Sequence, residues 1–131
     1  MTEEDRKQYA LYRIETAYEA LNSAVHSADG GFLSTATSRL YYAAFYSVKA
    51  LLVCNGIQTK THAATMGQFS QHFIKTGRLD KKYVKLISEL FDNRQEGDYE
   101  EMVIFEEEMV RSYFDPVREM ILRIEGEIKS E

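Results

Sequence analysis

The sequence predicts an all-α protein, an antiparallel up-and-down bundle of four long helices and one short helix. Only one of its 131 residues is proline, and Leu, Ala, Glu, Lys and Tyr are frequent, a composition that favours long helices. No segment alternates apolar and polar residues over enough positions to predict a strand. The stretch 38–56 is apolar on nearly every face, as is typical of a helix inside a helical assembly.

The size and charge of the chain limit its organisation. It fits one domain, residues 1–131, and its net charge of −5 disfavours binding of nucleic acid or membrane through bulk charge, leaving a local basic site open. Arg39, Lys49 and the length of stretch 38–56 argue against a membrane span, which needs about 20 apolar residues. Cys54 has no cysteine to pair with, so we expect a buried thiol. The polar start lacks a signal-peptide core, so we expect a cytoplasmic protein.

The first helix should begin at Thr2, whose hydroxyl precedes an acid at Asp5, as in a capping box. It should run to about Ser27, before the break at residues 29–31. Its buried stripe should consist of small and aliphatic residues: Ala10, Ile14, Ala17, Leu21 and Ala24.

The central helix should begin at Phe32 or Leu33 and end at Asn55 and Gly56, because glycine readily adopts the left-handed conformation that follows many helices. A third, shorter helix should begin after Thr61, its N-cap, and close at Gly77.

The fourth helix should begin after Asp80 and run to about Glu96, with Gly97 at its end and a polar turn from 98 to about 104. The last helix spans about 109–124 and contains Pro116. We expect a kink or break near Tyr113 to Asp115, or a helix that restarts with Asp115 as N-cap and Pro116 as first residue.

Arg39 is the first of three places with polar residues that a plain bundle does not need. Tyr42 and Tyr46 follow it at spacings of three and seven, on the same helix face. Arg39 is therefore either a surface residue near the helix start or a cation held at a cleft or interface beside stacked tyrosines.

The second place is Lys60-Thr61-His62, at the start of the third helix. One interpretation is a capping segment with a hydrogen-bonded His62; the other is a phosphate site at a helix N-terminus, where the helix dipole would lower the pKa of His62. The chain has no paired His spacing and no Cys/His cluster, so we expect no metal site and no cofactor.

The third place is the polar segment 92–99. Arg94 and Asp98 are four residues apart and can form an ion pair, with Tyr99 beside them. This group either fastens a loop to the bundle or forms a site. No glycine-rich phosphate loop and no nucleophile–base pair of the common enzymes is present in the sequence.

Three blocks together resemble the HEPN domain family, in its small stand-alone prokaryotic branch. They read SRLYYAAFYSVKALL with a later glycine, then KTH and QHFIKTGRLD, then NRQEGDY, and the resemblance covers about Tyr9 to Ile124. It implies a helical bundle that dimerises. It also implies a minimal nucleotidyltransferase as partner, the two acting as toxin and antitoxin.

The catalytic members of that family are metal-independent endoribonucleases. Their motif is an Arg, commonly followed by a polar residue, with a His four to six positions on: the His transfers protons and the Arg stabilises phosphate charge. Arg94 and Gln95 match its start, whereas Asp98, Tyr99 and Glu100 occupy the later positions and none is His. His62 can take the place of the missing motif histidine only if the fold brings it near Arg94.

Three functions follow from these observations. The first is a dimeric module that binds a nucleotide, RNA or a partner nucleotidyltransferase. The alternatives are an endoribonuclease toxin that uses Arg94 with Asp98, Tyr99 or His62, and a purely structural bundle. The residues expected to bind nucleotide or RNA are Arg39, Tyr42, Lys60, His62 and Arg94. The Tyr-rich faces of the central helix and the surroundings of Arg94 are the candidate dimer surfaces.

Overall fold

The computed structural model describes residues 1–99 and 106–131, with side chains for residues 1–94 and 106–131. Within this part every regular element is helical, which confirms the all-α prediction. The elements in chain order are α1 (Glu3–Asp29), α2 (Leu33–Cys54), α3 (His62–Phe69), a π-helical turn (Ser70–Ile74), α4 (Lys82–Tyr99), α5 (Glu107–Arg111) and α6 (Phe114–Lys129).

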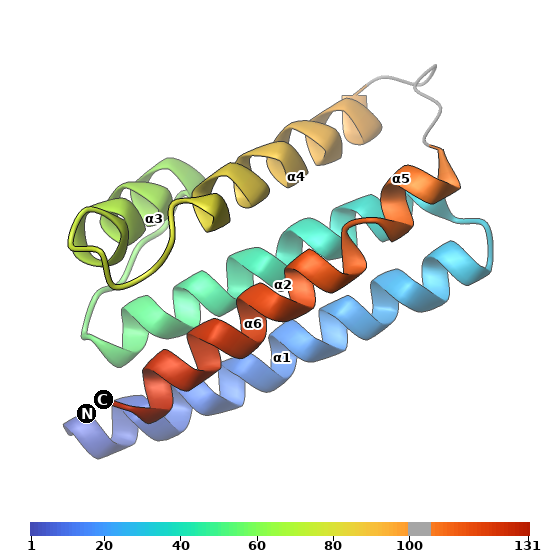
Figure 1. Cartoon of the computed structure of the whole chain (residues 1–131). Coiled ribbons are helices and arrows are strands. Elements are labelled where there is room, and N and C mark those ends of the chain that lie inside the picture. Colours follow the sequence, from blue (N-terminus) through green and yellow to red (C-terminus); the bar gives the residue numbers. More distant parts are fainter. Residues whose placement is uncertain (100–105) are drawn as a thin grey trace.

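The four long helices α1, α2, α4 and α6 run alternately in opposite directions, so the bundle is antiparallel and up-and-down as predicted (Figure 1). Helix α3 lies at the end of the bundle where α2 ends and α4 begins, and the two chain termini lie together. Helix α2 packs against α1, α4 and α6, which confirms it as the central helix. Half of its 22 residues are buried.

The first helix forms as predicted. The Thr2 hydroxyl accepts a hydrogen bond from the Asp5 amide at 3.0 Å, and the Asp5 carboxylate accepts one from the Thr2 amide at 3.1 Å, which completes the capping box. All five residues of the predicted stripe are buried. Because most of them are alanines, α1 and α2 can approach closely.

Gly56 ends the turn after α2 in the left-handed region, with φ of +75°. Gly126 lies inside α6, where an added Cβ would meet no atom within 4 Å. We expect Gly56→Ala to lower the free energy of unfolding by about 1–2 kcal/mol, because an L side chain is strained at positive φ. Gly126→Ala, the matched control, should raise it by up to about 1 kcal/mol. Urea denaturation measures both. Equal changes in the free energy of unfolding would contradict the strained, left-handed backbone expected at position 56.

Two predicted boundaries were wrong. The third helix does not continue as α-helix to its closing glycine, because the π-helical turn Ser70–Ile74 replaces it after Phe69. Helix α4 continues through Gly97 to Tyr99, so residues 98 and 99 are helical rather than the start of a turn. One glycine costs a helix only about 1 kcal/mol and does not by itself end it. The rest of the predicted turn lies outside the described residues.

The last helix is broken, as Pro116 predicted. Helix α5 ends at Arg111 and α6 begins at Phe114, so the break lies at the start of the expected region. The alternative with Asp115 as N-cap was wrong, since Tyr113 is the N-cap and Pro116 is the third residue of α6. The first turn of a helix needs no backbone donor there, so proline is tolerated. The described chain thus has two short α-helices, α3 and α5, instead of one.

Candidate functional site

Tyr41 and His62 form a hydrogen bond between α2 and the start of α3. The Tyr41 side chain is buried, and its hydroxyl oxygen lies 2.7 Å from Nδ1 of His62; which atom donates depends on the histidine tautomer. His62 is the first residue of α3, after Thr61, whose hydroxyl accepts from the Ala64 amide at 3.0 Å. Its ring is stacked on Phe91 of α4, with centroids 3.9 Å apart. The imidazole is therefore held by its own position in α3, by the hydrogen bond to α2 and by stacking on α4.

Burial sets the protonation of this pair. It lowers the pKa of His62, against a smaller opposing effect of the Asp92 charge. The sequence predicted this direction but attributed it to the helix dipole, whereas loss of hydration is the larger cause. Burial, and next the nearby Tyr42, raise the pKa of Tyr41 to about 12, with Arg94 acting in the opposite direction. Both partners are consequently neutral near neutral pH.

The lowered pKa of His62 predicts a pH dependence of stability. The unfolded chain takes up the proton at about pH 6.5, above the folded-state pKa, so the unfolded state binds more protons in that window. We therefore expect the free energy of unfolding to fall as the pH drops below about 6.5. His62→Asn should reduce this slope, and the exposed His72→Asn should keep it. Urea denaturation at several pH values gives the slopes, and identical slopes in all three proteins would refute the expectation.

Arg94 reaches the same place from α4. Its guanidinium carbon lies 5.6 Å from the ring centroid of Tyr41 and 5.0 Å from that of Tyr42. Tyr41 thus contacts Arg94 through its ring and His62 through its hydroxyl. Arg94 and His62 are 32 positions apart in the sequence, and the fold brings both to one tyrosine.

Arg39 of α2 lies beside the same cluster. Its guanidinium carbon is 5.3 Å from the centroid of Tyr42, so the Tyr42 ring contacts two arginines, Arg39 and Arg94. Such contacts are attractive because a cation interacts favourably with the ring quadrupole. Lys60 is exposed beside the α3 cap and makes no hydrogen bond, ion pair or ring contact with Tyr42 or any other residue whose side chain is described. The side chains of Asp98 and Tyr99 lie outside those residues, as does Glu100.

Two further cations on the same side were not predicted as site residues. On α2, Arg39, Tyr42, Tyr46 and Lys49 follow at helical spacing, so extending the Arg39 pattern by one more turn would have found Lys49. Arg13 comes from α1, and its guanidinium carbon lies 5.6 Å from the Tyr46 ring centroid. No signal in the sequence points to that pairing. We call the following residues the basic–aromatic face: Arg13, Arg39, Tyr42, Tyr46, Lys49 and Arg94.

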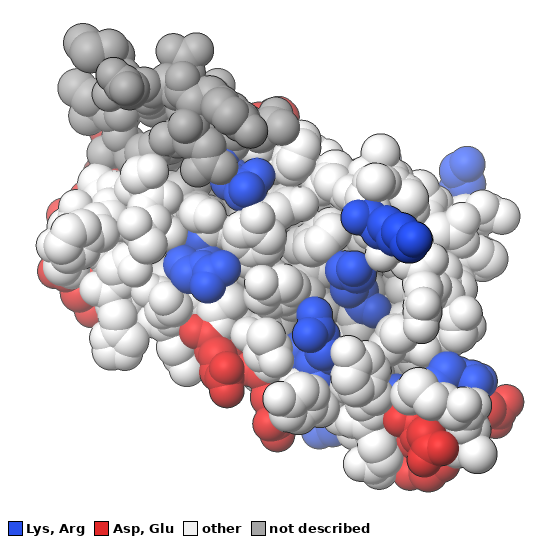
Figure 2. Space-filling view, turned by 180° about the vertical axis from the view of Figure 1, so that it is seen from behind, with Lys and Arg blue, Asp and Glu red and all other residues white. Residues whose placement is uncertain are grey.

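Arg13, Arg39 and Lys49 form no ion pair with any residue whose side chain is described. Outside the face, several cations are paired with carboxylates, namely Arg78, Lys82, Arg111, Arg118, Arg123 and Lys129. Others, such as Lys60, Lys75, Lys81 and Lys85, form no ion pair with a described side chain. Helix α2 lies behind α6 in Figure 1, and Figure 2 shows the molecule from that rear side, with Lys and Arg side chains spread over a mostly uncharged surface. Through Arg13, Arg39 and Lys49, the face thus carries cations that are unpaired among the described side chains, on a protein that is acidic overall.

The chemistry of the face suits an anion that carries flat rings. Arginine and lysine bind phosphate oxygens, and aromatic side chains stack on bases. Within the described residues, no group of three His, Cys, Asp or Glu side chains is placed to hold a metal ion. No helix in that part of the chain is long and apolar enough to cross a membrane.

Comparison with known families gives a match over most of the chain. The model of the HEPN domain matches residues 10–127. The chain belongs to the HEPN family. Arg94, in the NRQEGDY block, and His62, in the KTH block, both contact Tyr41 in this structure.

Relatives of this HEPN protein come from bacteria and archaea. It is 35% identical to the "UPF0332 protein" of Thermotoga maritima over 109 residues, 83% of each chain. It is 36% identical over 95 residues to "Putative toxin MJ0142" of Methanocaldococcus jannaschii, covering 72% of this chain and 65% of that one. "Putative toxin MJ0605" of the same archaeon is 31% identical over 105 residues, 73% of this chain and 78% of the other.

Proposed function

We propose that this HEPN protein is a toxin-like module that binds single-stranded RNA through its basic–aromatic face. One observation carries the proposal: the Tyr42 ring lies in contact with two guanidinium groups, those of Arg39 and Arg94. The cations bind phosphates, and the tyrosines provide surfaces on which bases stack. Archaeal relatives named as toxins support the toxin-like role.

The local distribution of charge makes this binding compatible with an acidic protein. A net charge of −5 repels RNA at long range, but the field close to the face is set by its own cations. Because Arg13, Arg39 and Lys49 have no carboxylate partner among the described side chains, their charge is available to an incoming phosphate.

We further propose that the protein acts as a homodimer and that a minimal nucleotidyltransferase is its partner. In a dimer, two basic–aromatic faces would offer a longer strand more contacts than one. Light scattering after size exclusion gives the mass, and co-expression with the neighbouring gene tests for a stable complex. A monomer that purifies alone would contradict both statements.

The RNA proposal is tested by titrating a labelled single-stranded RNA oligonucleotide at several salt concentrations. Arg39→Gln should weaken binding about tenfold and should lower the salt slope by about 0.7, the value for one single-strand phosphate contact. Arg118→Gln is the matched control, because Arg118 lies on α6 and pairs with Asp115 at 3.0 Å. It removes the same charge and should change binding little.

Equal affinities of wild type, Arg39→Gln and Arg118→Gln would contradict the proposal. So would binding that does not depend on salt. Absence of RNA binding by the wild type would leave the structural bundle as the function that fits.

A second candidate function, a metal-independent endoribonuclease, is favoured by the contact of Tyr41 with both Arg94 and His62. His62 is neutral near neutral pH. In the tautomer whose Nδ1–H donates to the Tyr41 hydroxyl oxygen, Nε2 carries no proton and can accept one from a ribose 2′-hydroxyl. Arg94 would stabilise the charge that develops on the phosphate. Asp98 and Tyr99 remain the other proposed partners of Arg94.

A further inference from the structure

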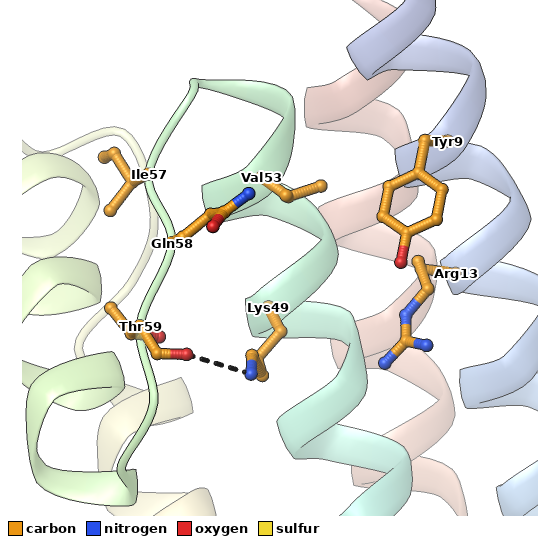
Figure 3. Close-up of a pocket in the computed structure, with 7 residues that line it drawn as sticks. All are labelled: Tyr9, Arg13, Lys49, Val53, Ile57, Gln58 and Thr59. Carbon is orange, nitrogen blue, oxygen red and sulfur yellow. Dashed lines mark hydrogen bonds between the residues drawn. The ribbon is translucent and has the colours of Figure 1, made fainter. Parts of the chain in front are cut away.

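A pocket of about 230 Å³ lies between α1, the end of α2 and the connection that follows it. Figure 3 shows the side chains that line it, which are Tyr9, Arg13, Lys49, Val53, Ile57, Gln58 and Thr59. Arg13 extends into the pocket region from α1 and Lys49 from α2, and the Lys49 ammonium is directed at Thr59. We call this the Arg13–Lys49 pocket.

The pocket holds two positive charges and no carboxylate among its lining residues. Lys49 Nζ donates one hydrogen bond, to the Thr59 carbonyl oxygen at 3.1 Å, so two ammonium donors are left for a ligand. The Arg13 guanidinium rests on the Tyr46 ring, which positions it and leaves its N–H donors available. Neither cation is paired with a carboxylate among the described side chains.

The rest of the lining adds neutral polar groups and an apolar wall. The Tyr9 hydroxyl points toward Arg13, and the Gln58 amide lies on the side of the connection. Val53 and Ile57 are half-buried and apolar. A ligand that fits is therefore an anion with a less polar part, because phosphate oxygens satisfy the cations and a sugar contacts the apolar wall.

We propose that the Arg13–Lys49 pocket is a phosphate-binding site for a phosphate group attached to a sugar. The phosphate belongs either to a free nucleotide or to an RNA strand. The pocket residues Arg13 and Lys49 belong to the basic–aromatic face, so for an RNA strand this inference rests on the proposed function. It does not involve the cluster of Arg94, Tyr41 and His62. Lys49 follows Arg39 by ten residues on α2, about 15 Å along the helix, so a strand of several nucleotides reaches from one to the other.

The test is a calorimetric titration with two probes, adenosine monophosphate and a short single-stranded RNA. The pocket variants are Arg13→Gln and Lys49→Gln, and Arg118→Gln is the charge-matched control on α6. We expect each pocket variant to weaken at least one probe about tenfold or more, corresponding to the loss of one charge-assisted contact. Arg118→Gln should remain within twofold of the wild type. Thermal unfolding checks that every variant is folded. If Lys49→Gln does not fold, the affinities of Arg13→Gln alone test the pocket.

The two probes distinguish the two sources of phosphate. Weakened binding of adenosine monophosphate assigns the pocket to a free nucleotide, and weakened binding of RNA alone assigns it to a strand. Affinities of Arg13→Gln that match the control for both probes would overturn the proposal. If Arg39→Gln weakens RNA while Arg13→Gln does not, the proposed RNA-binding function survives without this pocket; the reverse result retains the pocket and removes the Arg39 contact.

Discussion

His62→Asn is expected to lower the rate of RNA cleavage by about 10²–10⁴-fold under the endoribonuclease assignment, the contribution of a positioned acid–base group. Asparagine keeps a polar group near the Tyr41 hydroxyl but cannot take up a proton. The imidazole is held by a hydrogen bond to Tyr41 at 2.7 Å and by stacking on the Phe91 ring. A lower cleavage rate in His62→Asn would therefore reflect the loss of the group that transfers the proton. Purified protein and a fluorescently quenched RNA substrate give the rates.

The matched control for this variant is His72→Asn, because His72 is exposed and bonded only within its own segment, to Gln68 at 3.0 Å. It should cleave at the wild-type rate. Cleavage by His62→Asn at the wild-type rate would exclude His62 as the acid–base group. No cleavage by the wild type would remove the enzyme assignment and leave RNA binding as the proposed function.

The same assignment predicts an effect in cells. Expression of the wild type in a bacterial host, without the neighbouring gene, should arrest growth and degrade RNA, and Arg94→Ala should relieve the arrest. Arg94 lies over Tyr41 and Tyr42, so a soluble and folded Arg94→Ala is required before the result is interpreted. Normal growth with the wild type would favour the binding module.

Leu51→Ala is expected to lower the free energy of unfolding by about 3–5 kcal/mol. Leu51 is fully buried in α2, the helix that contacts α1, α4 and α6, so the cavity would lie where the bundle has least freedom to collapse. The loss combines the transfer free energy of the deleted atoms with the cost of the cavity. Urea denaturation followed by circular dichroism measures the change.

Leu122→Ala is the control for the same chemical change. Leu122 lies on α6 with 54% of its surface exposed, and its truncation should change the free energy of unfolding by about 0.5 kcal/mol or less. Comparable losses at positions 51 and 122 would mean that α2 is not the centre of the core.

Much of the fold was predictable because it depends on local features. The Thr2 capping box, the buried stripe of α1 and the turn at Gly56 all follow from side-chain chemistry within a few residues. The break before Pro116 follows from the missing backbone donor of proline. The prediction failed at Gly97, because one glycine costs too little to end a helix, and at Ser70–Ile74, where a π-helical turn replaces the α-helix.

The sequence by itself determined an all-α bundle around stretch 38–56, the HEPN motifs and the cationic and aromatic character of Arg39, Tyr42 and Arg94. Only the tertiary structure decided that His62 and Arg94 meet at Tyr41 and that Arg13 and Lys49 line one pocket. The physical reason is that helical periodicity fixes which residues share a face of one helix, whereas contacts between helices depend on how those helices pack and rotate against one another.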